Sequence, residues 1–281
     1  MSTLEITTML GCPIMCNFCP QDELKDGYDM NNKYLSLDDF ISITNKVPKD
    51  VRIDFSGMAE PWVNDKCTDM VEHALSQGFR VAIYTTLYNM TENDAIRVIN
   101  LLDNYRSQVE VLCIHLQDKN NNMRGLKLDL NWLNIANLFI EFYNKKTLRN
   151  FQFMTMDESG ELHPLLEPLK SVVSLFHMHD RAGSLNTDQI AGQQVNIINT
   201  KKGAIKCSYT NKYDQNVLLP NGDILMCCMD YGKKHNFGNI LKGNYKDIFE
   251  SNGYKELIIA NFNEDLGDSI CRKCERAINS N

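Results

Sequence analysis

The sequence has no excess of basic residues. Its 29 Lys and Arg residues against 36 Asp and Glu residues give a formal net charge of −7, whereas proteins that bind nucleic acid by neutralising phosphates are usually basic. The basic residues are also dispersed, and the densest spots are only the pairs Lys201-Lys202 and Lys233-Lys234. We therefore expect no nucleic-acid partner.

Long apolar runs are missing as well. The chain has no run of about 18 consecutive apolar residues, the length that a membrane-spanning helix needs. The N-terminus also lacks the basic start and apolar stretch of a signal peptide. These absences predict a cytoplasmic protein with no membrane partner. Solenoid repeats and low-complexity segments are absent too, and 281 residues can bury a large core.

Cysteine, by contrast, is plentiful, with ten residues. In a reducing compartment this favours metal binding over disulfides. Cys12, Cys16 and Cys19 have the spacing C-x3-C-x2-C on a loop that follows a predicted strand, residues 4–10. Three thiolates on four irons would leave one iron open for a non-protein ligand. The alternative is a structural zinc site, which wants four ligands, or buried free thiols.

Up to about residue 186, short apolar runs alternate with amphipathic stretches, a pattern typical of βα units on a parallel sheet. The predicted strands cover residues 4–10, 51–56, 79–86, 109–116, 151–156 and 172–179, and the main helices 36–46, 66–77, 93–103 and 130–145. The pattern predicts an α/β fold, a partial (β/α)6 barrel over residues 1–186. Such sheets place functional residues at the carboxyl ends of their strands. The residues at or just beyond predicted strand ends are Cys12, Glu60, Thr85, His115 and Arg181.

The rest of the chain has a different character. Residues 187–206 are polar and weakly periodic and are predicted to be a linker, and residues 207–281 a small C-terminal domain. In this domain Asn221-Gly222 between two apolar runs predicts a β-hairpin, and a helix is predicted over residues 245–259. Cys207 precedes the hairpin and Cys227 ends its second strand, so the two can lie side by side.

The Cys12-x3-Cys16-x2-Cys19 motif after a first strand resembles that of the radical S-adenosylmethionine (radical SAM) enzymes. In that family three cysteines hold a [4Fe-4S] cluster whose open iron is chelated by S-adenosylmethionine. Reductive cleavage of the cofactor yields a 5′-deoxyadenosyl radical that abstracts hydrogen from the substrate. The resemblance implies that Phe18 lies against the adenine. It also implies a low-potential electron donor such as flavodoxin or ferredoxin.

Three more segments extend the resemblance. Gly57-Met58-Ala59-Glu60-Pro61 is similar to the family's Gly-Gly-Glu-Pro segment, with altered glycine placement, which implies that Gly57 and Glu60 receive the methionine amino group. Thr85 would contact the ribose or methionine. Arg181 resembles an arginine found after the sixth strand, and its guanidinium would bind the cofactor carboxylate. The alternatives are an ordinary turn at Glu60 and a surface ion pair between Arg181 and Asp180.

The C-terminal spacing Cys207-x14-Gly222-x4-Cys227 matches the opening of the auxiliary-cluster domain called SPASM. Only Cys271-x2-Cys274 follows, so this region is similar to the shortened twitch form with one extra [4Fe-4S] cluster. The resemblance implies four ligands, Cys207, Cys227, Cys271 and Cys274. A zinc ion on the same thiolates is the alternative. Cys228 would point away from Cys227 and is predicted not to bind.

A fully ligated second cluster cannot bind substrate without losing a thiolate, so its expected role is to take one electron from a substrate radical. With loss of a proton, this makes a two-electron oxidation. The cysteine layout resembles that of the aminocyclitol dehydrogenases (2-deoxy-scyllo-inosamine dehydrogenase type), which oxidise a secondary alcohol to a ketone. The sequence therefore favours an oxidoreductase that acts on a small, carbohydrate-like alcohol.

Two rival hypotheses remain. Peptide-modifying maturases commonly carry an N-terminal leader-binding domain, and the eleven residues before Cys12 leave no room for one, which favours a small substrate. A non-catalytic iron–sulfur or zinc scaffold would have no need for the segment around Glu60.

His115 and His179 lie near predicted strand ends and are candidates for binding substrate or moving a proton, although core histidines would fit equally well.

Overall fold

The computed structural model describes residues 1–156, 159–175, 180–185, 199–262 and 268–280. Within these ranges, one sheet of nine strands has the order β10-β9-β8-β1-β2-β3-β4-β5-β6. Its strands are β1 (Thr3–Ile6), β2 (Arg52–Phe55), β3 (Val81–Thr85), β4 (Val109–His115), β5 (Phe151–Thr155), β6 (Val173–Leu175), β8 (Gln215–Leu218), β9 (Asp223–Leu225) and β10 (Asn236–Asn239).

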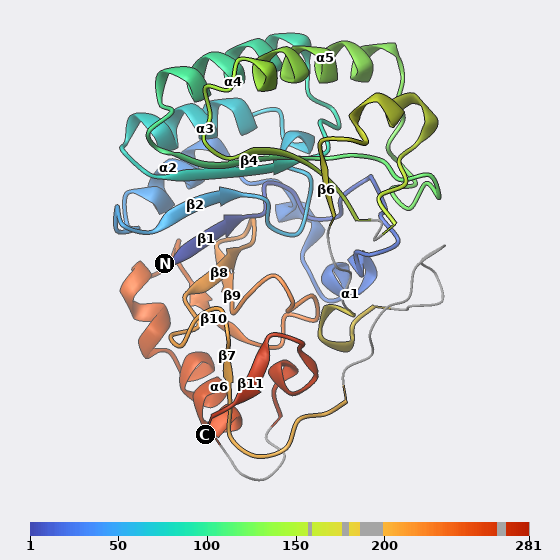
Figure 1. Ribbon diagram of the computed structural model, residues 1–281. Coiled ribbons are helices and arrows are strands. Elements are labelled where there is room, and N and C mark those ends of the chain that lie inside the picture. The colour runs from blue at the N-terminus through green and yellow to red at the C-terminus, as the bar shows by residue number, and fades with distance from the viewer. Residues whose placement is uncertain (157–158, 176–179, 186–198, 263–267, 281) are drawn as a thin grey trace.

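The first six strands are parallel to their neighbours, and helices cover the outer face of this part of the sheet (Figure 1). These helices are α2 (Leu37–Thr44), α3 (Cys67–Ser76), α4 (Glu92–Asn104) and α5 (Leu130–Asn144), and the short α1 (Gln21–Lys25) follows the cysteine loop. The predicted α/β fold with its six βα strands is confirmed. The strands are shorter than predicted, and residues 176–179 of the last one lie outside the described residues.

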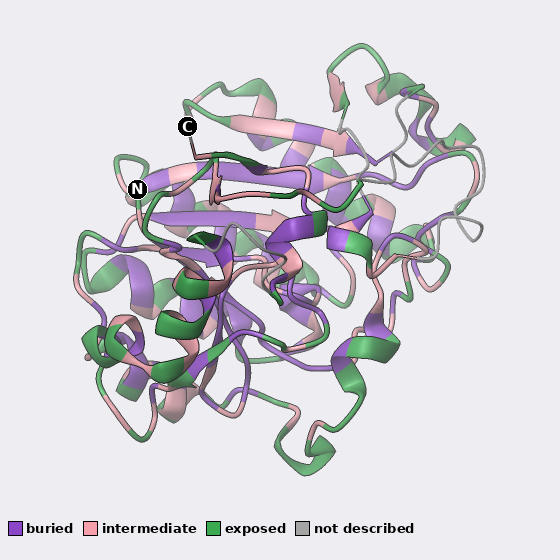
Figure 2. Ribbon diagram, turned by 90° about the horizontal axis from the view of Figure 1, so that it is seen from below, coloured by how far each residue is buried: buried purple, intermediate pink, exposed green. Residues whose placement is uncertain are grey.

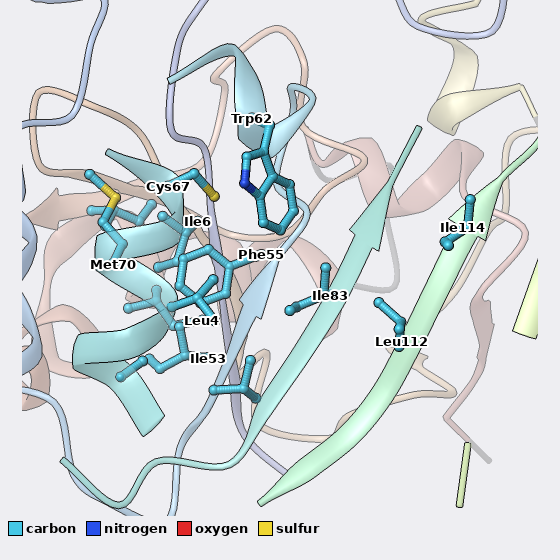
Figure 3. Packing of buried hydrophobic residues seen from close by; sticks show 14 of the residues in the cluster. Leu4, Ile6, Ile53, Phe55, Trp62, Cys67, Met70, Ile83, Leu112 and Ile114 are labelled. Carbon is cyan, nitrogen blue, oxygen red and sulfur yellow. The ribbon is translucent and has the colours of Figure 1, made fainter. Parts of the chain in front are cut away.

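The strands alternate between two environments, as the pleat of a strand requires. Figure 3 shows the side that faces the helices, where Leu4, Ile53 and Ile83 lie near Met70 of α3 and form part of a continuous apolar core. The intervening side chains, such as Glu5, point to the other face. This polar inner face forms the wall of the site described below. Figure 2 shows that most strand residues are buried and that the helices carry exposed turns.

The C-terminal part of the chain joins the same sheet. Strand β8 pairs in parallel with β1, with Glu5 opposite Val217, and β8, β9 and β10 continue antiparallel. The hairpin predicted at Asn221-Gly222 is present, and Gly222 has a φ of +88° that favours glycine. The hairpin pairs with an edge of β1 that would otherwise leave backbone groups unpaired. The predicted hairpin therefore forms, but on the sheet of the barrel.

The remaining elements form a small unit next to this hairpin. It contains the two-stranded sheet of β7 (Ile205–Cys207) and β11 (Ala277–Asn279), the 3-10 helix η7 (Ile270–Lys273) and helix α6 (Asn252–Phe262). Figure 1 shows this unit below the barrel, beside the hairpin strands.

The single helix predicted over residues 245–259 is wrong. A 3-10 helix η6 (Tyr245–Glu250) and α6 are separated at Ser251, which has an extended backbone with φ −65° and ψ 159°. The break lets α6 approach β10 closely: a Cβ on Gly253 would lie 2.1 Å from the Asn236 carbonyl oxygen. Local periodicity predicts helix on both sides of the break but does not reveal this contact.

None of the helices within the described ranges has both the length and the apolar character that a membrane span requires.

Candidate cluster and cofactor site

A cavity of about 520 Å³ runs along the inner face of the sheet and the carboxyl ends of its strands. Both groups of cysteines open into it, from opposite parts of the sequence. The cysteines in its lining are Cys12, Cys16, Cys19, Cys207, Cys227, Cys228, Cys271 and Cys274. All ten cysteines of the chain are free thiols. The fold thus brings eight thiols to one cavity, while Cys67 and Cys113 are buried elsewhere.

The three cysteines of the first group interact with one another. The Cys16 thiol donates a hydrogen bond to Cys19, which lowers the pKa of Cys19 to about 6 and, together with burial, holds that of Cys16 well above its usual value. Arg181 further favours the Cys19 thiolate. Burial raises the pKa of Cys12 to about 11. A metal would therefore displace protons from at least two of these thiols.

Two neighbouring segments hold the cysteine loop in place. The Gln21 side chain accepts a hydrogen bond from the Cys12 backbone N–H at 3.1 Å and donates one to the Met58 carbonyl at 2.7 Å. Behind the loop, the Gly125 N–H donates to the Ile14 carbonyl at 2.6 Å. A Cβ on Gly125 would lie 2.3 Å from the Pro13 carbonyl oxygen, so glycine is required there. Neither contact was predicted from the sequence.

Glu60 lies at the cavity wall and is 5% exposed, and its carboxylate accepts several hydrogen bonds from within the protein. It accepts hydrogen bonds from Thr85 Oγ1 at 2.6 Å, from the Thr86 N–H at 2.7 Å, from Thr86 Oγ1 at 2.8 Å and from the Trp62 N–H at 3.4 Å. Burial nevertheless raises its pKa. These bonds tie the segment after β2 to the end of β3. The predicted contacts of Glu60 and Thr85 with a cofactor stay predictions.

Phe18 and Gly57 also line the cavity. Phe18 is 4% exposed. Gly57 has a φ of +53°, and an added Cβ would lie 2.6 Å from Thr7 Oγ1, so the chain after β2 packs tightly on the end of β1. The backbone of this segment is thereby presented to the cavity. The contact of Phe18 with the adenine and that of Gly57 with the methionine amino group stay predictions.

Arg181 points into the cavity from η4 (Arg181–Gly183). Its Nε lies 3.4 Å from the Phe18 carbonyl oxygen, to which it donates. Its charge acts on Cys19 and Glu5, so the half-buried Arg181 is directed toward the cavity. The φ of Arg181 is +50°, a strained conformation for a residue with a side chain. Its predicted bond to a cofactor carboxylate stays a prediction.

His115 ends β4 and lines the cavity. Burial lowers its pKa to about 4, with a further contribution from the charge of Arg181. Its Nε2 is buried without a hydrogen-bond partner among the described residues, and its ring lies edge-on to Tyr84 with centroids 6.4 Å apart. His115 is therefore neutral at ordinary pH. The other candidate, His179, lies outside the described residues.

Glu5 is a cavity residue that was not predicted from the sequence. Burial, together with the nearby Asp54 carboxylate, raises its pKa to about 7. Its carboxylate accepts a hydrogen bond from Ser56 Oγ at 3.3 Å and contacts the Cys228 thiol. The signal was present: Glu5 is a charged residue at an alternate position of a strand whose neighbours are apolar, and such residues rarely occur without a role.

The second group of cysteines gathers where β7, β9 and η7 meet. Cys207 ends β7, Cys227 follows β9, and Cys271 and Cys274 lie in and just after η7. The charges of these thiols act on one another: Cys227 on both Cys271 and Cys274, and Cys207 likewise on both. Burial is the main cause that raises the pKa of each. Cys228 follows Cys227 directly and its charge acts on Cys227, but its side chain packs against a different cluster, which contains Leu10 and Met58.

Residues 207–275 match the family of iron–sulfur cluster-binding domains called SPASM. A comparison with curated protein sequences finds no match. Among solved structures, that of BtrN in complex with AdoMet and 2-DOIA is similar, with a TM-score of 0.62 and 15% identity over 100% of this chain and 94% of BtrN. The structure of anSMEcpe with bound AdoMet and the Cp18Cys peptide has a TM-score of 0.57 and 14% identity over 97% of this chain and 86% of anSMEcpe.

The chain has a radical SAM fold with a C-terminal SPASM domain. The resemblance inferred from the cysteine motifs is thus confirmed at the level of the fold. At these identities the two solved structures show the fold alone, and neither the substrate nor the reaction follows from them.

The thiols of the two cysteine groups are soft donors of the kind that hold iron–sulfur clusters. Within the described residues, no three Cys, His, Asp or Glu side chains come close enough together to hold one metal ion. Three soft donors in the first group and four in the SPASM domain fit two [4Fe-4S] clusters.

Proposed function

We propose that this protein is a radical SAM enzyme that oxidises a small, carbohydrate-like alcohol to a ketone. The observation that carries the proposal is the single cavity into which both cysteine groups open. Cys12, Cys16 and Cys19 would hold the cluster that binds S-adenosylmethionine, and Cys207, Cys227, Cys271 and Cys274 the second cluster. When bound, the first cluster and its cofactor supply a 5′-deoxyadenosyl radical. A low-potential donor such as flavodoxin or ferredoxin would be a partner.

The balance of the reaction assigns a task to each side of the cavity. A secondary alcohol that becomes a ketone loses one hydrogen atom from carbon, one proton from oxygen and one electron. The hydrogen atom leaves on the side of the first group. The four SPASM thiolates would hold the group that accepts the electron, since a cluster with four protein ligands has no open iron. The proton needs an acceptor in the chain.

Glu5 fits the role of proton acceptor. Its carboxylate lines the cavity, and its pKa of about 7 is high enough to take a proton and low enough for it to be ionised near neutral pH. His115, with a pKa of about 4, is a weaker base. Arg181 lies near Glu5 and favours its ionised form.

The test of the proposed function is label transfer. Anaerobic enzyme with reductant and S-adenosylmethionine is incubated with 2-DOIA and other cyclitols that carry deuterium on the carbinol carbons. We expect deuterium to appear in 5′-deoxyadenosine. One molecule of ketone should form for each molecule of labelled 5′-deoxyadenosine.

The fold likeness to anSMEcpe, whose structure holds a peptide, supports peptide modification as a second candidate. A peptide with deuterium on the Cys β-carbon is therefore included. Label from the peptide and from none of the alcohols would refute alcohol oxidation and favour that candidate.

The Glu5→Gln variant tests the proton acceptor. The pKa of Glu5 is raised above its ordinary value, so the accepting carboxylate form grows as pH rises through about 7. We expect the wild-type rate of ketone formation to rise over that range. Glu5→Gln should lose this pH dependence and form ketone about 100-fold more slowly, with cofactor cleavage retained.

The control is Glu110→Gln, which changes a carboxylate outside the cavity that pairs with Arg80. An unchanged pH profile in Glu5→Gln would exclude Glu5.

A further inference from the structure

Tyr231 connects the two halves of the site. It lies in the turn between β9 and β10, four residues after Cys227. Its side chain is 4% exposed and packs with Leu10, Leu24 and Met58 of the barrel. It also lines the cavity. A residue of the SPASM domain is therefore embedded among barrel residues, next to the first cysteine group.

The turn that carries Tyr231 is fixed to the barrel. The Lys233 ammonium donates hydrogen bonds to the carbonyls of Glu23, at 3.0 Å, and Leu24, at 2.8 Å. Both residues belong to α1, the helix that directly follows Cys19-Pro20. Within the turn, the Asp230 carboxylate accepts from the backbone N–H groups of Lys234 and His235, at 2.8 and 2.7 Å. These bonds hold the backbone around Tyr231 at a set position relative to the cysteine loop.

The Tyr231 hydroxyl donates a hydrogen bond to the Cys19 sulfur. The positive charge of Arg181 also lowers the pKa of Cys19. Two groups that stabilise negative charge thus converge on the last cysteine of the first group. One comes from the barrel and the other from the SPASM domain.

We propose that Tyr231 sets the reduction potential of the first cluster through its hydrogen bond to Cys19. This inference rests on the proposed function, in which Cys19 is a cluster ligand. Reduction adds negative charge to a cluster and its thiolates, so a donor to a ligand sulfur stabilises the reduced form and raises the potential. The role is one of tuning, because the hydroxyl acts through a ligand and need not touch substrate. The SPASM domain would thereby contribute to the first step of the reaction as well as to the last.

The test is a redox titration of Tyr231→Phe followed by electron paramagnetic resonance. It is carried out without substrate in a Cys271→Ala/Cys274→Ala background, so that the first cluster gives the signal. At a fixed ambient potential, we expect the ratio of reduced to oxidised cluster to fall about tenfold, or 59 mV for a one-electron couple. The control is Tyr213→Phe, which removes a buried cavity hydroxyl that bonds to Asn261. It should leave the ratio unchanged.

A ratio that stays within twofold in Tyr231→Phe, or that falls equally in Tyr213→Phe, would overturn the proposal. If Tyr231→Phe does not assemble the cluster, 3-fluorotyrosine at position 231 keeps the side-chain shape and makes the hydroxyl a stronger donor. It should raise the ratio, and no rise would count against Tyr231. Iron content distinguishes a failure of the proposed function from a failure of the tuning role alone. No iron bound to the wild-type first group refutes the proposed function, whereas an intact cluster with an unmoved potential refutes only the tuning role.

Discussion

Replacing Cys16 with alanine is expected to abolish the formation of 5′-deoxyadenosine. Cys16 lies between the other two cysteines of its loop, its thiol bonds to Cys19, and its backbone pairs with Met123 behind the loop. Its loss would leave two thiolates where three are needed. The backbone contacts that hold the loop do not involve the sulfur, so the fold should survive. The measurement is 5′-deoxyadenosine formed by anaerobic protein with S-adenosylmethionine and dithionite.

Cys67→Ala is the matched control for Cys16→Ala. Cys67 is also a buried free thiol, but it lies at the start of α3 and outside the cavity. This variant should cleave the cofactor at close to the wild-type rate. Undiminished cleavage in Cys16→Ala would show that the loop of Cys12, Cys16 and Cys19 is not the site of cofactor cleavage.

The Cys271→Ala/Cys274→Ala variant is expected to separate cofactor cleavage from oxidation. Both thiols are 8% exposed and lie in or just after η7. This segment contacts η4, which carries Arg181, whereas the first cysteines lie on the loop between β1 and α1. The first group should therefore keep its cluster and still form 5′-deoxyadenosine. Without the second cluster the substrate radical has no acceptor for its electron, and ketone should fall below detection.

Cys228→Ala is the control for this variant, since Cys228 lines the same cavity but lies among other residues. It should retain the second cluster and form ketone. Ketone formation that persists in Cys271→Ala/Cys274→Ala would mean that the electron leaves the substrate by another route. The SPASM domain would then have a structural role.

Patterns of neighbouring residues predicted the parts of the fold that depend on local chemistry. The alternation in β1 to β5 and the Asn221-Gly222 turn gave the strands and the hairpin, because pleating and turn conformation act over a few residues. The short spacing of Cys12, Cys16 and Cys19 likewise predicted the first thiol group, whereas the second group, spread from residue 207 to residue 274, was predicted from the resemblance to the SPASM domain. The pairing of β8 with β1 joins residues more than 200 positions apart, and no local pattern encodes it.

The site shows the same limit. Residues at strand ends were predicted to meet, and the cavity brings Cys12, Glu60 and His115 to its wall. The hydrogen bonds from Thr85 and Thr86 to the Glu60 carboxylate could not be predicted from the sequence, because they depend on how two strand ends are spaced. Tyr231 was missed for a similar reason. In the sequence it follows the hairpin strand β9, but in the structure its side chain contacts Cys19 of the first group.

Metal content is the most direct test of the claim that two clusters face one cavity. Iron, zinc and sulfide are measured in anaerobically reconstituted wild-type protein and in Cys271→Ala/Cys274→Ala. Two [4Fe-4S] clusters predict about eight irons and no zinc in the wild type, and about four irons in the variant. About four irons with one zinc in the wild type, the zinc being lost in the variant, would contradict the account.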